Sequence, residues 1–206
     1  MKTQYGDILV FHSHSFISRG IQFFMNMWRW VNGRFKPFYA FVPNHIAMGD
    51  NENRIIEAIE QGVFSQPFNR DEIIKGKKTI KVYSYPWSDE QKKVIDEVYD
   101  NLEGKPYQII NFLQNIIYTL TFGVVWLGRK GDASNGAVYC SKLGAEVMYK
   151  TTIRDLVKSD LDSDAHVYFR DYWKITPYQM SVWIEDNAKL THTYEIDSSG
   201  NITEVN

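Results

Sequence analysis

The one thiol of this chain lies where a helix is expected to begin. Cys140 follows a loop at residues 131–136, which consists of glycine, alanine and small polar residues, and precedes apolar residues at helical spacing. Free backbone N–H groups and the positive end of a helix dipole favour a thiolate at such a position. The same N–H groups can stabilise the charge that develops on an attacked carbonyl. Cys140 is therefore the candidate nucleophile, with Tyr139 and Ser141 as its neighbours around the expected oxyanion.

An imidazole and a carboxylate lie on a β-hairpin that the sequence predicts ahead of this cysteine. Two β runs flank residues 49–53, which are dense in turn formers. With the turn centred on Asn51, His45 and Glu57 stand directly opposite each other and share a face of the ladder. A carboxylate beside an imidazole fixes its tautomer and supports its charged form. With Cys140, they supply the nucleophile, base and orienting group that acyl chemistry needs.

Each candidate also has an interpretation without catalysis. A lone cysteine is often a small buried hydrophobe, and a lone histidine is often structural. Glu60 is the lesser candidate for the carboxylate, because it would face the other side of a continued strand. His12 and His14 have a spacing that suits metal, but no matched carboxylate or thiol accompanies them, so we expect a solvated loop or pocket rim and no metal site. His166 and His192 are expected at the surface.

The remaining pattern predicts the elements that must hold these side chains. A Ser88–Gln91 capping box predicts a helix that Gly104 ends. Cys140 opens another helix, and Pro177 occupies the first position of one near the C-terminus. Apolar or alternating runs predict strands at 8–11, 39–48, 54–59, 78–85, 191–196 and 201–205. These elements predict an α+β fold with a small antiparallel sheet packed with helices.

Two apolar stretches raise the question of membrane contact. Residues 109–128 carry no charge over 20 positions, a length that could span a bilayer. Asn111, Gln114 and Asn115 lie within this stretch, and polar groups are expensive in lipid. We therefore expect a buried or interfacial helix, so that membrane contact is possible but not favoured. Residues 16–31 predict a helix whose aromatic side chains belong to the core or a pocket wall, namely Phe23, Phe24, Trp28 and Trp30.

Composition bounds the class of protein and its partners. The chain has 206 residues, of which 44% are hydrophobic, and a formal net charge of -2, as in an ordinary globular domain. That charge gives no basic excess to neutralise phosphates, so nucleic acid is not an expected partner. One cysteine excludes an intramolecular disulfide and zinc sites built on several thiolates. The first residues lack the apolar region of a signal peptide, which favours a cytoplasmic protein, with release by lysis or peripheral membrane association as alternatives.

A series of short segments runs in order through residues 6–150. They read GDIL at 6–9, SRGIQ at 18–22, NHIA at 44–47, IIEA at 55–58, GV at 62–63, LEGKPY at 102–107 and YCSKL at 139–143. Together they resemble the YiiX-like branch of the NlpC-type hydrolases. The resemblance implies a circularly permuted papain-like fold, with Cys140 as nucleophile, His45 as base and Glu57 as the polar third residue. Asn44 departs from the family, which more often has Ser there.

The same resemblance implies the domains and the reaction. Residues 1–160 would form the catalytic domain, and residues 161–206 a C-terminal extension packed on it. The implied protein is a cysteine peptidase or amidase that hydrolyses an amide bond, in a peptide or a cell-wall-like peptide, through an acyl-enzyme and without a cofactor. Two alternatives stay open. A lipid acyltransferase or thioesterase, as in the lecithin retinol acyltransferase group, has a similar Cys–His core, and a binding module that has lost catalysis would look the same.

Overall fold

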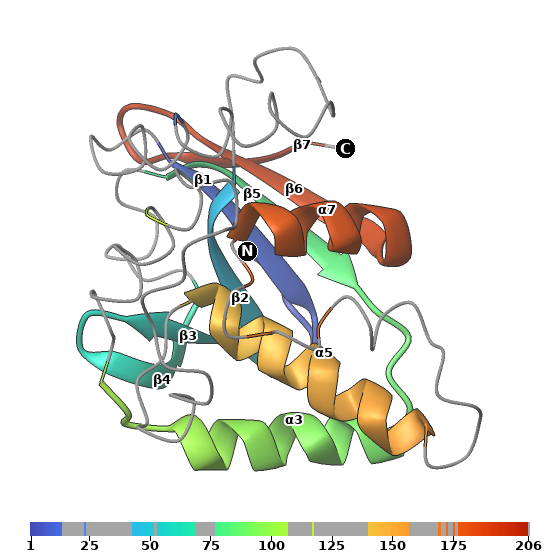
Figure 1. Ribbon diagram of the computed structural model, residues 1–206. Helices are drawn as coiled ribbons and strands as arrows, with labels where there is room; N and C mark the ends of the chain where they lie inside the picture. The colour runs from blue at the N-terminus through green and yellow to red at the C-terminus, as the bar shows by residue number, and fades with distance from the viewer. Residues whose placement is uncertain are drawn as a thin grey trace.

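The computed structural model of this protein describes residues 1–13, 23, 43–51, 53–68, 77–106, 117, 140–156, 169, 172, 175 and 177–205. Within these residues the fold is α+β, with seven strands in one antiparallel sheet and three helices packed on one of its faces (Figure 1). The expected α+β class is confirmed, and the sheet is larger than the small one that the sequence predicts.

Strands from both ends of the chain share this sheet. The strands are β1 (Ile8–Ser13), β2 (Pro43–Asn51), β3 (Arg54–Ile59), β4 (Gly62–Pro67), β5 (Lys77–Ser84), β6 (Lys189–Ile196) and β7 (Ile202–Val205). Their order is β4-β3-β2-β1-β5-β6-β7, and each neighbouring pair is antiparallel. The expected terminal hairpin, β6–β7, therefore extends the same sheet as the hairpin that carries His45.

Helix α3 (Asp89–Leu102) begins and ends where the local sequence predicts. Ser88 Oγ accepts the N–H of Gln91 at 3.2 Å, and the Gln91 side chain accepts the N–H of Ser88 at 2.9 Å. Gly104 follows the helix with a φ of 68°, a left-handed conformation that glycine adopts without steric cost. The capping box and the glycine stop are both confirmed.

Helices α5 (Cys140–Leu156) and α7 (Pro177–Asn187) also begin at the residues that the sequence predicts. With α3 they cover one face of the sheet, and α5 contacts β2 and β3 (Figure 1). The core on this face joins all three helices to the strands through Ile8, Val10, Ile46, Met48, Val94, Val98, Leu143, Val147, Met180 and Ile184. Burial of these apolar side chains fixes α5, and with it Cys140, against the strands.

The opposite face of the sheet is buried as well. Its cluster consists of Leu9, Phe11, Ala47, Ile55, Phe68, Ile80, Val82, Tyr194 and Ile196. Side chains alternate between the two faces along a strand, so His45 shares this second face with Ala47. A strand that is buried on both faces is a continuous apolar run, as residues 8–11 are.

The two apolar stretches of the sequence fall largely outside the described residues. Of residues 109–128 only residue 117 is described. Of the aromatic cluster only Phe23 is described, and it is 63% exposed, which corrects the expected core or pocket position; a single exposed aromatic is ordinary on a protein surface. Among the described residues, no helix combines the length and the apolar character that crossing a membrane requires.

Candidate active site

Cys140 is the first residue of α5, and 5% of it is exposed. The helix places it beside β2 and β3 (Figure 1). The next residue, Ser141, is fully buried, and its hydroxyl donates to the Ile175 carbonyl at 2.7 Å. That bond anchors the start of the helix, so Ser141 offers its backbone N–H to the thiol rather than its hydroxyl. Tyr139 lies outside the described residues.

The β2–β3 hairpin carries the other two predicted residues in a register that differs from the expected one. Ala47, not His45, stands opposite Glu57. The pairing shifts between Gly49 and Asn51, which puts an irregularity of the bulge type into β2. Beyond this irregularity the pairs are centred on position 52, one residue past the expected Asn51, so the partner of Glu57 lies two residues from the expected one. The prediction of direct opposition is wrong, whereas the shared face is confirmed, because a two-residue shift preserves the alternation of side chains.

His45 and Glu57 make the contact that a shared face allows. The Nε2 atom of His45 lies 2.6 Å from the Oε2 atom of Glu57. Their side chains are 13% and 4% exposed, so this hydrogen bond to a carboxylate is shielded from water. The ring of Phe11, which pairs with His45 across β1 and β2, meets the imidazole edge-on with centroids 5.2 Å apart. A carboxylate and an aromatic ring therefore hold the imidazole from two directions.

Cys140 contacts this imidazole near the last residues of β2 that pair with β3. The pairing of β2 with β3 ends at Ala47 and Glu57, while β3 stays paired with β4 to its last residue. Helix α5 packs on the first face of the sheet, and His45 stands with Ala47 on the second. The thiol of Cys140 contacts His45 two residues along β2 from the last pair with β3.

The thiol of Cys140 is stabilised in its ionised form by His45. Burial is the largest single influence and raises the pKa of the thiol, but it is outweighed. The charge of His45, a hydrogen bond from its ring and the backbone N–H groups of Ile46 and Ser141 bring that pKa below its usual value of 9.0. Because Glu57 holds Nε2 of His45, the Nδ1 atom is the one left for the sulfur. Thiol, imidazole and carboxylate form one connected series.

A fourth residue, Gln66, completes the surroundings of Glu57 and was not predicted. Its side-chain amide donates to Oε1 of Glu57, the oxygen that His45 does not use. Gln66 is 6% exposed and lies on β4, opposite Ile55. The tight turn at residues 60–61 was the available signal, because a hairpin closed there puts positions 57 and 66 on one face.

The described histidines other than His45 have different roles. His12 is 3% exposed within β1, which corrects the expectation of a solvated loop or pocket rim, because the strand continues past the apolar run. Burial lowers the pKa of His12 to about 4. His192 is partly exposed, and its Nδ1 atom lies 2.7 Å from Oε1 of Glu204, a partner that the sequence did not suggest. His14 and His166 lie outside the described residues. Within the described ranges, no three His, Cys, Asp or Glu side chains gather closely enough to hold a metal ion.

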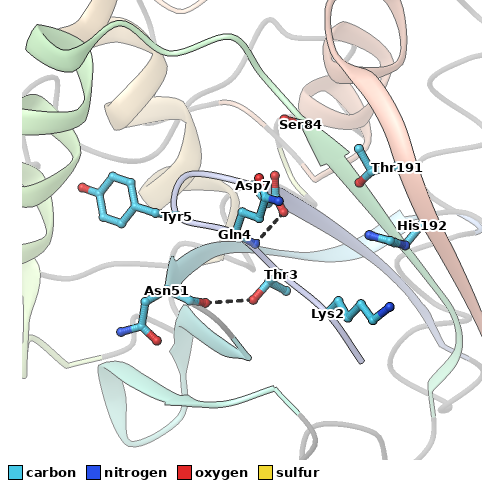
Figure 2. A pocket seen from close by; sticks show the side chains of 9 residues that line it. All are labelled: Lys2, Thr3, Gln4, Tyr5, Asp7, Asn51, Ser84, Thr191 and His192. Atoms are coloured by element: carbon cyan, nitrogen blue, oxygen red, sulfur yellow. Dashed lines mark hydrogen bonds between the residues drawn. The ribbon is translucent and has the colours of Figure 1, made fainter.

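A polar pocket of about 500 Å³ opens near the start of β1 (Figure 2). Its lining consists of Lys2, Thr3, Gln4, Tyr5, Asp7, Asn51, Ser84, Thr191 and His192. The hydroxyls of Thr3 and Thr191 donate to backbone carbonyls, and that of Ser84 bonds to Asp7. Asp7 precedes β1, whereas Phe11 beside His45 lies roughly 13 Å further along the strand. The pocket is therefore separate from the thiol, and none of its lining hydroxyls has an imidazole as partner in the structure that is described.

No protein-family model matches this chain, and no curated protein matches its sequence. Membership of a family is therefore a proposal. What carries it is the contact that joins Cys140, His45 and Glu57.

Proposed function

We propose that this protein is a thiol hydrolase that cleaves an amide bond, with Cys140 as nucleophile, His45 as base and Glu57 as the residue that orients His45. The observation that carries the proposal is the buried, connected series of thiol, imidazole and carboxylate. These three groups are what nucleophilic acyl transfer needs.

The proposal extends to the fold family. A circularly permuted papain-like fold of the YiiX-like, NlpC-type kind is supported by the order of the elements, because β2 with His45 precedes α5 with Cys140 in the chain. It is also supported by the position of the thiol at the first residue of a helix that packs on the histidine strand.

In the proposed acylation step, His45 takes the proton of Cys140, and the sulfur attacks the carbonyl carbon of the amide. A C–S bond forms while the carbonyl oxygen becomes an oxyanion, which backbone N–H groups at the start of α5 can stabilise. His45 then gives its proton to the amide nitrogen as the C–N bond breaks. The amine leaves, and a thioester joins the acyl group to Cys140.

Water completes the proposed cycle. His45 removes a proton from water, and the resulting hydroxide attacks the thioester carbon. The C–S bond breaks, the carboxylic acid leaves, and the proton on His45 returns to the sulfur. Glu57 stays ionised throughout and balances the imidazolium that forms in each half of the cycle.

The exposure of the site bears on the kind of substrate. Cys140 is 5% exposed and the side chain of His45 is 13% exposed. A substrate must therefore present its carbonyl carbon in a narrow segment, which an extended peptide and an unbranched acyl chain can both do. The choice of a peptide amide, with peptides of the cell-wall type included, rests on the family resemblance of residues 6–150.

Covalent labelling with an electrophilic peptide, such as a peptidyl acyloxymethyl ketone, tests the nucleophile. The chain has one cysteine, so a thiol label reports on Cys140 alone. We expect labelling of the folded protein, no labelling of Cys140→Ala and slow labelling of His45→Ala. Glu60→Gln, at an exposed position just after β3, is the matched control and should be labelled like the wild type. Labelling of Cys140→Ala at the wild-type rate would remove the nucleophile assignment.

Turnover of peptide amides tests the reaction. We expect a free acid and a free amine as products, with none formed by Cys140→Ala. Transfer of the acyl group to a lipid acceptor in place of water would replace the hydrolase proposal with an acyltransferase. A wild-type protein that is labelled no faster when folded than in urea would show that the fold does nothing to activate the thiol.

A further inference from the structure

We infer that Gln66 is a positioning residue for the proposed reaction: its amide holds the carboxylate of Glu57 in the orientation that lets His45 activate Cys140. The inference rests on the proposed function and deepens it. It assigns a role to a residue on a strand that contributes neither the thiol nor the imidazole.

Each oxygen of the Glu57 carboxylate receives a donor. Oε2 receives His45, and Oε1 receives the amide of Gln66. Glu57 is 3% exposed and Gln66 is 6% exposed, so water is a minor competitor for either oxygen. On β4, Phe64 stands opposite Glu57, and Gln66 is the next residue on the same face. A side chain in this diagonal position reaches the carboxylate without distorting the strand.

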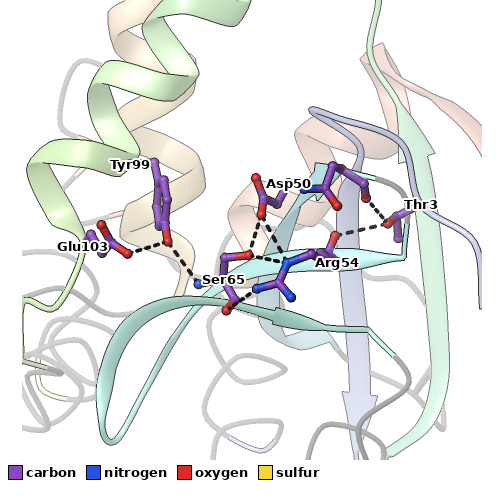
Figure 3. Close-up of polar contacts among 7 residues, drawn as sticks. Thr3, Asp50, Arg54, Ser65, Tyr99 and Glu103 are labelled. Carbon is purple, nitrogen blue, oxygen red and sulfur yellow. Dashed lines mark hydrogen bonds and ion pairs between the residues drawn. The ribbon is translucent and has the colours of Figure 1, made fainter.

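Hydrogen bonds fix the backbone of β4 next to Gln66 (Figure 3). The N–H of Ser65 donates to the hydroxyl of Tyr99 on α3 at 3.2 Å. The guanidinium of Arg54 donates to the carbonyl of Ser65 at 3.0 Å and to its hydroxyl at 3.1 Å, and that hydroxyl donates to Asp50. Figure 3 shows these side chains converging on Ser65 from α3 and from the β2–β3 hairpin. The strand that carries Gln66 is therefore held by contacts that do not involve Glu57.

The chemistry of a buried carboxylate makes the second donor matter. Burial disfavours the charged form of a carboxyl group, and hydrogen bonds to its oxygens offset that cost. Without the amide of Gln66, Oε1 of Glu57 would lose a donor, so the carboxylate would be held less firmly and its charge would be less well stabilised. His45 would then lose the partner that balances its imidazolium, and the thiolate of Cys140 would be less stable.

Two substitutions of similar size separate this role from packing. Gln66→Met removes the donor and keeps the volume, and Gln66→Glu replaces the amide with a second carboxyl group. Gln4→Met and Gln4→Glu make the same changes at an exposed glutamine near the other end of β1 and serve as matched controls. The readout is the rate at which iodoacetamide alkylates Cys140 across pH, with thermal unfolding of each variant measured alongside.

The expected results differ in pH dependence between the two variants. Gln66→Met should slow alkylation near neutral pH roughly 10-fold to 100-fold, the effect of losing one hydrogen bond to a charged group. Gln66→Glu should react nearly as the wild type at acid pH, where the new carboxyl is protonated and donates to Glu57. As pH rises, two adjacent carboxylates repel each other, so its reactivity relative to wild type should fall. A purely structural role would lower the melting temperature without this change in the pH profile.

The outcomes also separate this inference from the proposed function. If His45→Ala changes the alkylation profile and both Gln66 variants keep it, the role of Gln66 is overturned and the hydrolase proposal stands. If His45→Ala leaves the profile unchanged, both are overturned. A slowing of equal size in the Gln4 variants would likewise overturn the role of Gln66, because it would follow from the substitution chemistry alone.

Discussion

Replacing Glu57 with Gln removes one negative charge from the proposed site and changes its shape very little. The Nε2–Oε2 distance of 2.6 Å puts the centres of the imidazolium and carboxylate charges roughly 4 Å apart. At an effective dielectric constant of about 20, that attraction is about 4 kcal/mol. A neutral amide keeps about 1 kcal/mol of it as an ordinary hydrogen bond. The substitution therefore removes about 3 kcal/mol of support for the charged imidazole.

That loss converts into a measurable change in rate. Each 1.36 kcal/mol is about tenfold, so kcat/KM of Glu57→Gln should fall roughly 100-fold. The free energy of unfolding should fall by only about 1 kcal/mol, because the amide of Gln66 can turn and present its oxygen to the new side chain. The effect on the transition state thus exceeds the effect on folding, which is the signature of a residue that supports charge in the reaction.

The assay compares amide hydrolysis and iodoacetamide alkylation of Cys140 in the wild type, Glu57→Gln and Glu60→Gln. Glu60 lies exposed just beyond the same strand, so it controls for the loss of a carboxylate as such. Rates for Glu57→Gln within about threefold of the wild type would refute the reasoning, because they leave less than about 0.7 kcal/mol for the pair.

Two further predictions concern stability. Burial, followed by the charge of Lys81, lowers the pKa of His12 from 6.5 to about 4. Between these pH values the unfolded chain binds a proton more readily than the folded one, so stability falls as pH drops from 6.5 through about 4. The full loss of unfolding free energy is on the order of 3 kcal/mol. Urea unfolding across this pH range should show that loss in the wild type and a smaller loss in His12→Asn. Equal slopes of unfolding free energy against pH in the two proteins would contradict the prediction. Ser141→Ala leaves the Ile175 carbonyl without its 2.7 Å donor and should cost about 1–3 kcal/mol in thermal unfolding. The thiol should keep its reactivity, because Ser141 contacts it through its backbone N–H. A large loss of alkylation without unfolding would count against this backbone role of Ser141.

Local signals explain which elements the sequence could predict. The capping box at Ser88 and Gln91 and the glycine stop at Gly104 act within one turn of helix, so they located α3 without tertiary information. The proline at the start of α7 acts in the same way. The order of the sheet has no such signal, because β5 pairs with β6 across more than half of the chain. Burial of the sheet on both faces is likewise a tertiary property.

The candidate site could be predicted where a contact depends only on which face of a strand each side chain occupies. The expected register was wrong, yet His45 and Glu57 still meet, because a shift by two residues keeps both on one face. Gln66 was missed because β4 was not identified as a strand. The burial of a glutamine can be predicted only when its hydrogen-bond partners are known. The contact between Cys140 and His45 joins residues 95 positions apart in the chain, and no local pattern encodes it.

An ultraviolet titration of the Cys140 thiolate tests the central claim most directly, with Cys140→Ala subtracted to remove the tyrosine signal. We expect the wild-type thiolate to form below the usual cysteine pKa of 9.0, and His45→Ala to move its formation to higher pH, because burial is then opposed only by the N–H groups of Ile46 and Ser141. A thiol that titrates at or above the usual value, equally in both proteins, would contradict it.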